Sequence, residues 1–356
     1  VSQHFCYVDR DGNIAYWMSG RNPVRPEGDY RFPQGMMGPQ LEWDDAAVSE
    51  LSHHANPAKG YYGGWNNKSA PDVDNSFNEP VYYFGPFHRA HVIDEYLAAR
   101  DSLTFEEIRD LALNIATTDS IRKGGNPWIF VAEDFAAAVQ ADPTAEREAA
   151  LAMIADWDGH FVEGGTGAWA AGIDRADAWV LTDAWIREAV RLTFADELAT
   201  ATLTWEDHDI TVLFNALIHG LDGDQASVVN SYDWFQNLAD DTSPQSAQDI
   251  IVTALDNALA ALGELPWGEA ARGEIEYNHD MLGTVWKMPF SSRSTYAHCV
   301  EYDASGPVRI ESMFPLGESG DITMAADGSP VFDDHFFSMT DVYDGFAHRA
   351  FPLFEE

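Results

Sequence analysis

The order of strand-like and helix-like segments limits the fold of this chain more than any other feature. Residues 1 to about 88 have the pattern of strands and loops interrupted by Gly and Pro, whereas residues 89–273 carry apolar side chains at helical spacing. From about residue 274 to residue 356 the strand pattern returns. This order predicts an α+β fold in which both ends join one sheet system and the middle forms an inserted, mainly helical lobe. Two independent domains are the alternative that the order also permits.

Local patterns predict individual elements within these three regions. Two β-rich arms flank Asp11-Gly12-Asn13, which predicts an antiparallel hairpin between residues 5–8 and 14–17. Thr104 and Glu107 have the spacing of a capping box at the start of a helix. Helical spacing predicts helices at 89–100, 130–140, 145–157, 178–198 and 247–262, and β-rich runs predict strands at 284–286, 296–302 and 308–310.

The charge of the chain excludes one class of partner. There are 59 Asp and Glu residues against 20 Lys and Arg, which gives a formal net charge of −39, and only four of the bases are lysines. Binding to a nucleic-acid backbone is therefore not expected. The acids are scattered along the whole chain, which predicts a protein adapted to high salt, where molar salt screens repulsion over a Debye length of roughly 3 Å. An acidic protein from ordinary water is the alternative, and stability at low salt separates the two.

Several other classes of protein also lack support in the sequence. No apolar run approaches the roughly 18 residues that a membrane span needs. Cys6 and Cys299 cannot build a disulfide-rich scaffold, and we expect both to be buried free thiols. The motifs of dinucleotide-binding folds, P-loops, zinc proteases and nucleophile-elbow esterases are absent from the sequence.

The segment Gly60–Lys68 is the most unusual part of the sequence. It combines three glycines and a tryptophan with two adjacent amides, Asn66 and Asn67. Glycine allows close backbone approach, and an Asn side chain can donate a hydrogen bond to a developing oxyanion without introducing a titrating charge. A structural turn is the simpler interpretation of the same residues.

A series of landmarks runs along nearly the whole chain in a fixed order. They are Asp9 with Asp11–Tyr16, Gly28–Arg31, Asn56-Pro57, Gly60–Asn67, Arg89 with Ile93-Asp94, Asp142-Pro143, Trp157–Gly159, Gly317–Gly320 and the closing stretches 332–336 and 348–353. This ordered set resembles the penicillin acylase family of N-terminal nucleophile hydrolases. The Gly-Tyr and Trp-Asn-Asn parts of the segment at residues 60–67 are its most specific portion.

The resemblance implies a four-layer αββα fold and an amide hydrolase made as a precursor that cuts itself. The new N-terminal residue, usually Ser, is then the nucleophile, and its α-amino group, with a pKa near 8, is the base. Asn66 matches the family asparagine that helps to form the oxyanion hole, and Arg89 matches the arginine beside the nucleophile. A salt bridge at a helix start is the alternative role for Arg89.

The family's nucleophile belongs to a segment that would lie upstream of Val1. Ser2 does not replace it, because an N-terminal nucleophile must be the first residue. We therefore expect this sequence to be the C-terminal part of the family's β-chain, inactive alone and partnered by an upstream segment or chain that carries the nucleophile.

A structural calcium ion is a further implication of the resemblance, with no cofactor for the chemistry itself. The expected ligands are the backbone carbonyl of Tyr30 and the side chain of Asn78, and Asp72 and Asp74 are alternatives to Asn78. The implied substrates are N-acyl compounds such as acylated amines, acyl homoserine lactones or β-lactam amides. A related subunit that has lost catalysis and serves a structural or binding role is the alternative. Family members are often exported, but localisation and oligomeric state stay open.

Overall fold

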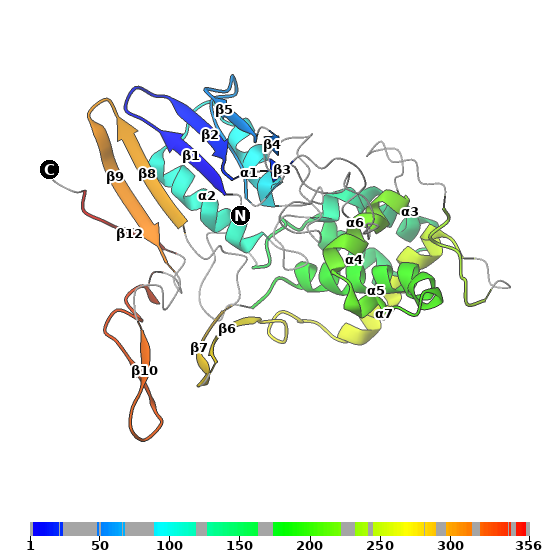
Figure 1. The fold of residues 1–356 in the computed structure, drawn as a ribbon. Coiled ribbons are helices and arrows are strands. Elements are labelled where there is room, and N and C mark those ends of the chain that lie inside the picture. Colours follow the sequence, from blue (N-terminus) through cyan, green and yellow to red (C-terminus); the bar gives the residue numbers. More distant parts are fainter. Residues whose placement is uncertain are drawn as a thin grey trace, which may run out of the picture.

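Most of the helices form a lobe apart from the antiparallel sheets, and the others lie against the strands (Figure 1). The structure is a computed structural model that describes residues 3–20, 22–23, 48–49, 51–65, 67, 89–118, 127–162, 174–221, 232–240, 245–280, 282–289, 297–314, 321–340, 342 and 347–353. Within these ranges the chain forms seven α-helices and twelve strands, and the paired strands are antiparallel. The predicted α+β class is confirmed.

The predicted N-terminal hairpin is also confirmed. Strand β1 (His4–Val8) pairs with β2 (Ile14–Met18), and β5 (His53–Ala55) pairs with the other edge of β2. At the turn, a carboxylate oxygen of Asp9 accepts the backbone N–H groups of Asp11 and Asn13 at 2.9 and 3.0 Å. Gly12 has a φ of 81°, a left-handed conformation that glycine adopts without strain.

Asn56 fastens β5 to this hairpin. Its side-chain oxygen accepts the backbone N–H of Ile14 at 3.0 Å, and its amide nitrogen donates to the side-chain oxygen of Asn13 at 3.0 Å. Asn56 has a φ of 49°, which asparagine tolerates better than most residues. Asp9, Asn13 and Asn56, three of the landmarks in the sequence, therefore hold three strands in register.

The C-terminal strands lie beside this sheet, and both groups of strands lie over α1 (Arg89–Ala98) and α2 (Phe105–Thr117) (Figure 1). Strand β9 (Gly306–Met313) pairs with β8 (Ala297–Asp303) on one side and with β12 (Arg349–Ala350) on the other. Helix α2 contacts β8 and begins with the predicted Thr104–Glu107 capping box.

A buried carboxylate ties α2 to β9. Glu311 is 7% exposed and accepts hydrogen bonds from Arg109 on α2, at 3.0 Å, and from Arg309. Burial opposes ionisation of this carboxyl, but the hydrogen bonds from Arg309 and Arg109 outweigh it and lower the pKa of Glu311. The contact joins residues that are 202 positions apart in sequence.

Five helices form a separate lobe with its own core. They are α3 (Ala132–Ala141), α4 (Ala145–Ala155), α5 (Asp177–Thr200), α6 (Ile210–Leu221) and α7 (Ala247–Leu262). Trp185, at the centre of the lobe, is fully buried and donates its indole N–H to the carbonyl of Ile251 at 3.1 Å. The predicted helices agree with these bounds to within two residues at most ends, whereas α6 was not predicted.

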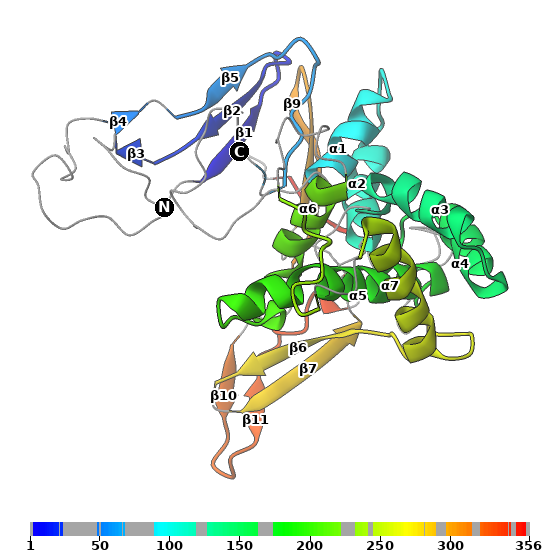
Figure 2. The same ribbon diagram turned by 90° about the vertical axis from the view of Figure 1, so that its right-hand side faces the viewer.

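The remaining strands form small two-stranded sheets (Figure 2). They are β3 (Asn22–Pro23) with β4 (Val48–Ser49), β6 (Glu274–His279) with β7 (Gly283–Pro289), and β10 (Ile322–Met324) with β11 (Pro330–Phe332). The predicted strands at 284–286, 296–302 and 308–310 coincide with β7, β8 and β9. The division into regions 1–88, 89–273 and 274–356 stays a prediction.

Two findings concern the cysteines and the membrane. Cys6 and Cys299 are free thiols, but Cys6 is exposed and Cys299 is only partly buried, so the expectation of two buried thiols was wrong. Cys6 lies on β1, whose five residues are all exposed in the described part of the structure. In the ranges given above, no helix has the length and apolar character needed to cross a bilayer.

Candidate active site

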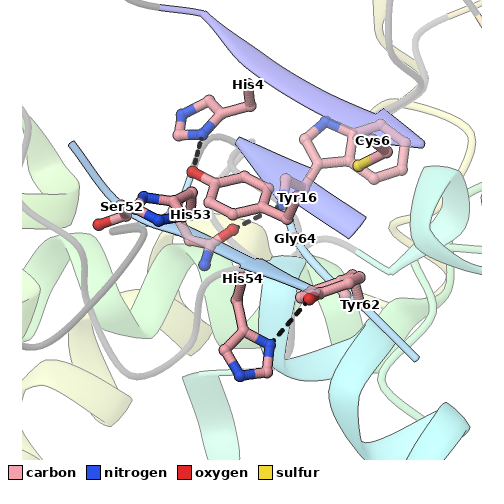
Figure 3. Close-up of a pocket in the computed structure, with 11 residues that line it drawn as sticks. His4, Cys6, Tyr16, Ser52, His53, His54, Tyr62 and Gly64 are labelled. Atoms are coloured by element: carbon pink, nitrogen blue, oxygen red, sulfur yellow. Dashed lines mark hydrogen bonds between the residues drawn. The ribbon is translucent and has the colours of Figure 1, made fainter. Parts of the chain in front are cut away.

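A cavity of about 580 Å³ lies between the β1–β2–β5 sheet and the glycine-rich loop that follows β5. Side chains from the three strands form one wall, and residues 62–65 with Asn67 form another (Figure 3). A cavity of this volume accommodates a typical small organic ligand.

Strand register explains which side chains form the sheet wall. Cys6 on β1 lies opposite Tyr16 on β2, and Tyr16 lies opposite His54 on β5. Residues that are opposite in a sheet point to the same face, and so do residues two apart on one strand, which adds His4. The result is a row of polar and aromatic side chains across three strands, and all four residues line the cavity.

Two hydrogen-bonded histidine–tyrosine pairs line the cavity (Figure 3). A hydrogen bond joins Nδ1 of His4 to the hydroxyl of Tyr16 at 2.5 Å, and the two rings stack with centroids 5.7 Å apart. A second hydrogen bond joins Nδ1 of His54 to the hydroxyl of Tyr62 at 3.0 Å. Tyr62 belongs to the glycine-rich loop, so this pair connects the loop to β5.

The loop is anchored to helix α1 by both polar and apolar contacts. Asp94 on α1 accepts hydrogen bonds from Lys59 and from the hydroxyl of Tyr61, each at 3.0 Å, and these contacts lower the pKa of its carboxyl. Tyr61 and Trp65 also pack against the buried apolar side chains of α1 and α2, which are Ile93, Leu97, Leu111 and Ile115. The Ile93-Asp94 landmark thus serves to hold the loop.

Two glycines allow the loop its close contacts. A Cβ atom on Gly63 would lie 2.9 Å from Cγ2 of Ile93, so a glycine is required where the backbone passes over α1. A Cβ atom on Gly64 would lie 2.8 Å from Oδ1 of Asn67. That same oxygen accepts the backbone N–H of Trp65 at 2.8 Å, so Asn67 fixes the loop from within.

Arg89 lies at the first position of α1, next to this loop. Its guanidinium carbon is 5.2 Å from the centre of the Trp65 ring, and its Nε is buried. At this distance the guanidinium and the ring attract each other. The structure therefore places Arg89 beside the residue that precedes Asn66 in the chain.

The other predicted site residues lie outside the described residues. These are Asn66 and the candidate calcium ligands Tyr30 and Asn78, together with the alternatives Asp72 and Asp74. The separation between the Asn66 amide and the Arg89 guanidinium is therefore still a prediction. Trp65 and Asn67, the neighbours of Asn66 in the chain, both line the cavity. Among the described residues, no group of three His, Cys, Asp or Glu side chains could hold a metal ion.

Two groups that line the cavity, the Cys6 thiol and the Tyr62 hydroxyl, have raised pKa values. Cys6 is exposed as a residue, but its thiol faces the cavity, where partial burial raises its pKa, so the reactive thiolate is disfavoured at neutral pH. Burial, with a smaller effect of the nearby Cys6, also raises the pKa of Tyr62. The wall supplies hydrogen-bonding groups and ring surfaces, and its thiol is poorly suited to act as a nucleophile.

Sequence reasoning missed the residues of the sheet wall, notably His4, Tyr16 and His54. Alternation along the predicted hairpin could have placed His4 and Cys6 on one face. The pairing of Tyr16 with His54 joins residues that are far apart in sequence, and no local signal in either strand predicts it.

Comparison with known proteins defines the class to which this fold and cavity belong. The profile of the penicillin amidase family matches residues 1–334, so the chain belongs to that family. Among solved structures, the chain is similar to a thermostable penicillin G acylase from Alcaligenes faecalis, with a TM-score of 0.72 and 21% sequence identity. The match covers 99% of this chain and 65% of that chain, so this chain spans about two thirds of the length of the acylase. The profile match confirms the family resemblance, and the structural match shows that the fold is shared.

Proposed function

We propose that this chain is part of an acylase-type amidohydrolase that cleaves the amide bond of linear N-acyl compounds. The observation that carries the proposal is the cavity bounded by residues 62–65 and Asn67, because this loop holds Asn66 between two cavity-lining neighbours. The family membership and the penicillin acylase fold support the same reaction class. Acylated amines, acyl homoserine lactones and β-lactam amides are the candidate substrates.

In this proposal, Asn66 donates its side-chain N–H to the oxyanion of the tetrahedral intermediate. One such donor typically contributes about 3 kcal/mol to transition-state stabilisation. A donor is effective only when it is held in place before the reaction, and the loop is held at Asp94, at Ile93 and within itself by Asn67. These contacts supply the rigidity that the proposed role needs.

Arg89 supplies a fixed positive charge beside the loop. A guanidinium stays charged at every relevant pH, so it favours the neutral form of a nearby α-amino group by repelling the ammonium form. It also stabilises the negative charge that develops on the substrate oxygen. The 5.2 Å contact with the Trp65 ring limits the motion of the guanidinium relative to the loop.

The nucleophile and the base belong, in this proposal, to an N-terminal residue outside the 356-residue sequence. Its hydroxyl or thiol attacks the substrate carbonyl, and its α-amino group takes the proton and later returns it to the leaving amine. We therefore expect the isolated chain to be inactive and the complete precursor to process itself before it hydrolyses substrates.

A structural calcium ion is part of the proposal but not of the chemistry. The carbonyl of Tyr30 and the side-chain oxygen of Asn78 would contribute ligands, because calcium prefers oxygen donors. No catalytic step depends on this ion.

The test uses the full-length gene product that contains this sequence, assayed with a panel of N-acyl 4-nitroanilides. We expect hydrolysis by the processed protein and a loss of about 10²- to 10³-fold in kcat for Asn66→Ala. The control Asn257→Ala changes an exposed amide on α7 in the helical lobe and should stay within twofold of the parent. Absence of hydrolysis across the panel, or full activity of Asn66→Ala, would refute the enzyme proposal. Absence of hydrolysis would also favour the alternative of a non-catalytic binding subunit.

A further inference from the structure

The described lining of the cavity has a composition unlike that of the whole chain. Three of its 11 residues are histidines, whereas the chain has 12 histidines in 356 residues. None of the 11 is Asp or Glu, although the chain contains 59 of these acids. Among the described residues that line the cavity, imidazoles are therefore enriched and carboxylates are absent.

His4 and His54 stand on the two outer strands of the β1–β2–β5 sheet, with Tyr16 on the strand between them. In each histidine, Nδ1 is engaged by a tyrosine hydroxyl, at 2.5 Å for His4 and 3.0 Å for His54. Within the described part of the chain, Nε2 of neither ring makes a hydrogen bond. Both rings line the cavity.

Nε2 is a hydrogen-bond donor in the tautomer in which Nδ1 accepts the proton of the tyrosine hydroxyl. A tyrosine hydroxyl keeps its proton at neutral pH and can donate it to Nδ1, which places the single proton of a neutral imidazole on Nε2. If the imidazole gains a second proton, Nε2 keeps its N–H and the ring becomes a cation. In both states the cavity presents N–H donors to a ligand.

A cavity that presents N–H donors, and whose described lining contains no carboxylate, suits a negatively charged ligand better than a positively charged one. A carboxylate accepts charge-assisted hydrogen bonds, which are stronger than those between neutral groups. A cationic ligand would find ring surfaces in the cavity but no described carboxylate to pair with. Metal binding by the histidines is not supported, because the described residues hold no group of three suitable ligands.

We propose that this cavity selects N-acyl compounds that carry a carboxylate and that His4 and His54 set this preference. The inference rests on the proposed acylase function and names its substrate class. Strands in a sheet are about 4.8 Å apart, so the backbones that carry the two histidines, on either side of β2, are at least about 10 Å apart. The two rings are therefore placed to contact different parts of a substrate. The carboxylate can therefore belong to the acyl group or to the amine.

The test compares three 4-nitroanilides of matched length with the processed full-length protein: adipoyl, heptanoyl and 6-aminohexanoyl. We expect kcat/KM to be highest for the adipoyl compound and lowest for the 6-aminohexanoyl compound. In the double variant His4→Phe/His54→Phe the adipoyl-to-heptanoyl ratio should fall about 10- to 100-fold, because hydrogen bonds to a charged group are lost while the ring shapes are kept. Single variants identify which histidine contributes more.

Two further variants separate hydrogen bonding from packing. His54→Gln keeps an N–H donor without the ring and should retain more of the adipoyl preference than His54→Phe does. His208→Phe, which removes an imidazole in the helical lobe away from the cavity lining, should leave the ratio unchanged.

A second pair of substrates places the carboxylate on the amine: N-heptanoylglycine and N-heptanoylethylamine. A preference for the carboxylate in either pair that is lost in the double variant supports the proposal and shows on which side the carboxylate belongs. No preference in either pair, or a preference that the double variant keeps, overturns it.

Failure of the acylase function is distinguishable from failure of this inference. If no compound is hydrolysed, calorimetry compares binding of the N-methylamides of adipic and heptanoic acid to the same protein. Tighter binding of the adipic compound that is lost in the double variant supports a carboxylate-selective cavity without catalysis. Equal binding of the two amides overturns the inference.

Discussion

Substitution of Gly64 by Ala tests whether the geometry of the glycine-rich loop controls the proposed amide hydrolysis. The new Cβ would lie 2.8 Å from Oδ1 of Asn67, closer than real Cβ contacts, and this oxygen already accepts the N–H of Trp65. Asn67 must therefore rotate away, which sacrifices a hydrogen bond that contributes about 0.5–1.5 kcal/mol to stability. The bond that joins Trp65 and Asn67, the two chain neighbours of Asn66, is then lost.

The expected effect on activity is larger than the effect on stability. Displacement of a catalytic group by about 1 Å can lower the rate about 10²-fold, and complete loss of an oxyanion donor lowers it by at most about 10³-fold. We therefore expect Gly64→Ala to reduce kcat of the processed enzyme by about 10- to 10³-fold, with a fall in the free energy of unfolding of about 1 kcal/mol. Acyl 4-nitroanilide hydrolysis and urea unfolding measure the two quantities.

A double-mutant cycle with Asn67→Ala provides the control. Asn67→Ala removes the oxygen with which the new Cβ collides, so Gly64→Ala should cause a much smaller additional loss of kcat in that background. Equal losses of kcat from Gly64→Ala in both backgrounds would show that the collision with Asn67 is not the cause. Unchanged kcat in Gly64→Ala would refute the dependence of catalysis on the loop.

Three further predictions concern stability. Asn56→Ala removes two hydrogen bonds and leaves an alanine at a φ of 49°, so we expect the free energy of unfolding in urea to fall by about 1–3 kcal/mol. Asn56→Gly should lose less stability, because glycine tolerates this φ. The pKa of Glu311 is lowered in the folded state, so its stabilising effect is present above the unfolded-state pKa of about 4.3 and is lost as the pH falls below that value. Glu311→Gln should therefore weaken the dependence of the free energy of unfolding on pH in this range. An unchanged dependence would contradict the lowered pKa. The net charge of −39 predicts that the protein unfolds at low salt and is stabilised at molar salt, which a series of Tm measurements against salt concentration would show. Full stability without salt would favour the alternative of an acidic protein that is not adapted to high salt.

Local sequence signals predicted elements best where the stabilising interactions are themselves local. Helix α7 (Ala247–Leu262) coincides with the predicted helix, and its capping box joins Ser246 and Asp249, which are only three residues apart. Helix α6 (Ile210–Leu221) was missed because it begins with three β-branched residues, Ile210, Thr211 and Val212, which are typical of a strand. Its burial in the lobe, which includes Phe214 and Leu217, stabilises the helix through tertiary contacts.

The candidate site was predictable only in part for the same reason. The resemblance directed attention to the loop at residues 60–67, and the structure places most of that loop at a cavity. The opposite wall depends on the pairing of Tyr16 with His54 and on the contact of Tyr62 with His54. These contacts depend on a register that Asn56 fixes by bonding to Asn13 and Ile14 across more than 40 residues.

The landmarks and the cavity side chains therefore carry different information. Asp9, Asn13 and Asn56 hold the three strands together, and Asp94 holds the loop against α1, so these landmarks specify a platform and the position of the loop. In the proposed function, this platform determines where the oxyanion donor stands. His4 and His54 are not among the landmarks, yet the platform directs them into the cavity. Side chains in such positions can change without loss of the platform, which makes them the natural place for substrate preference to be set.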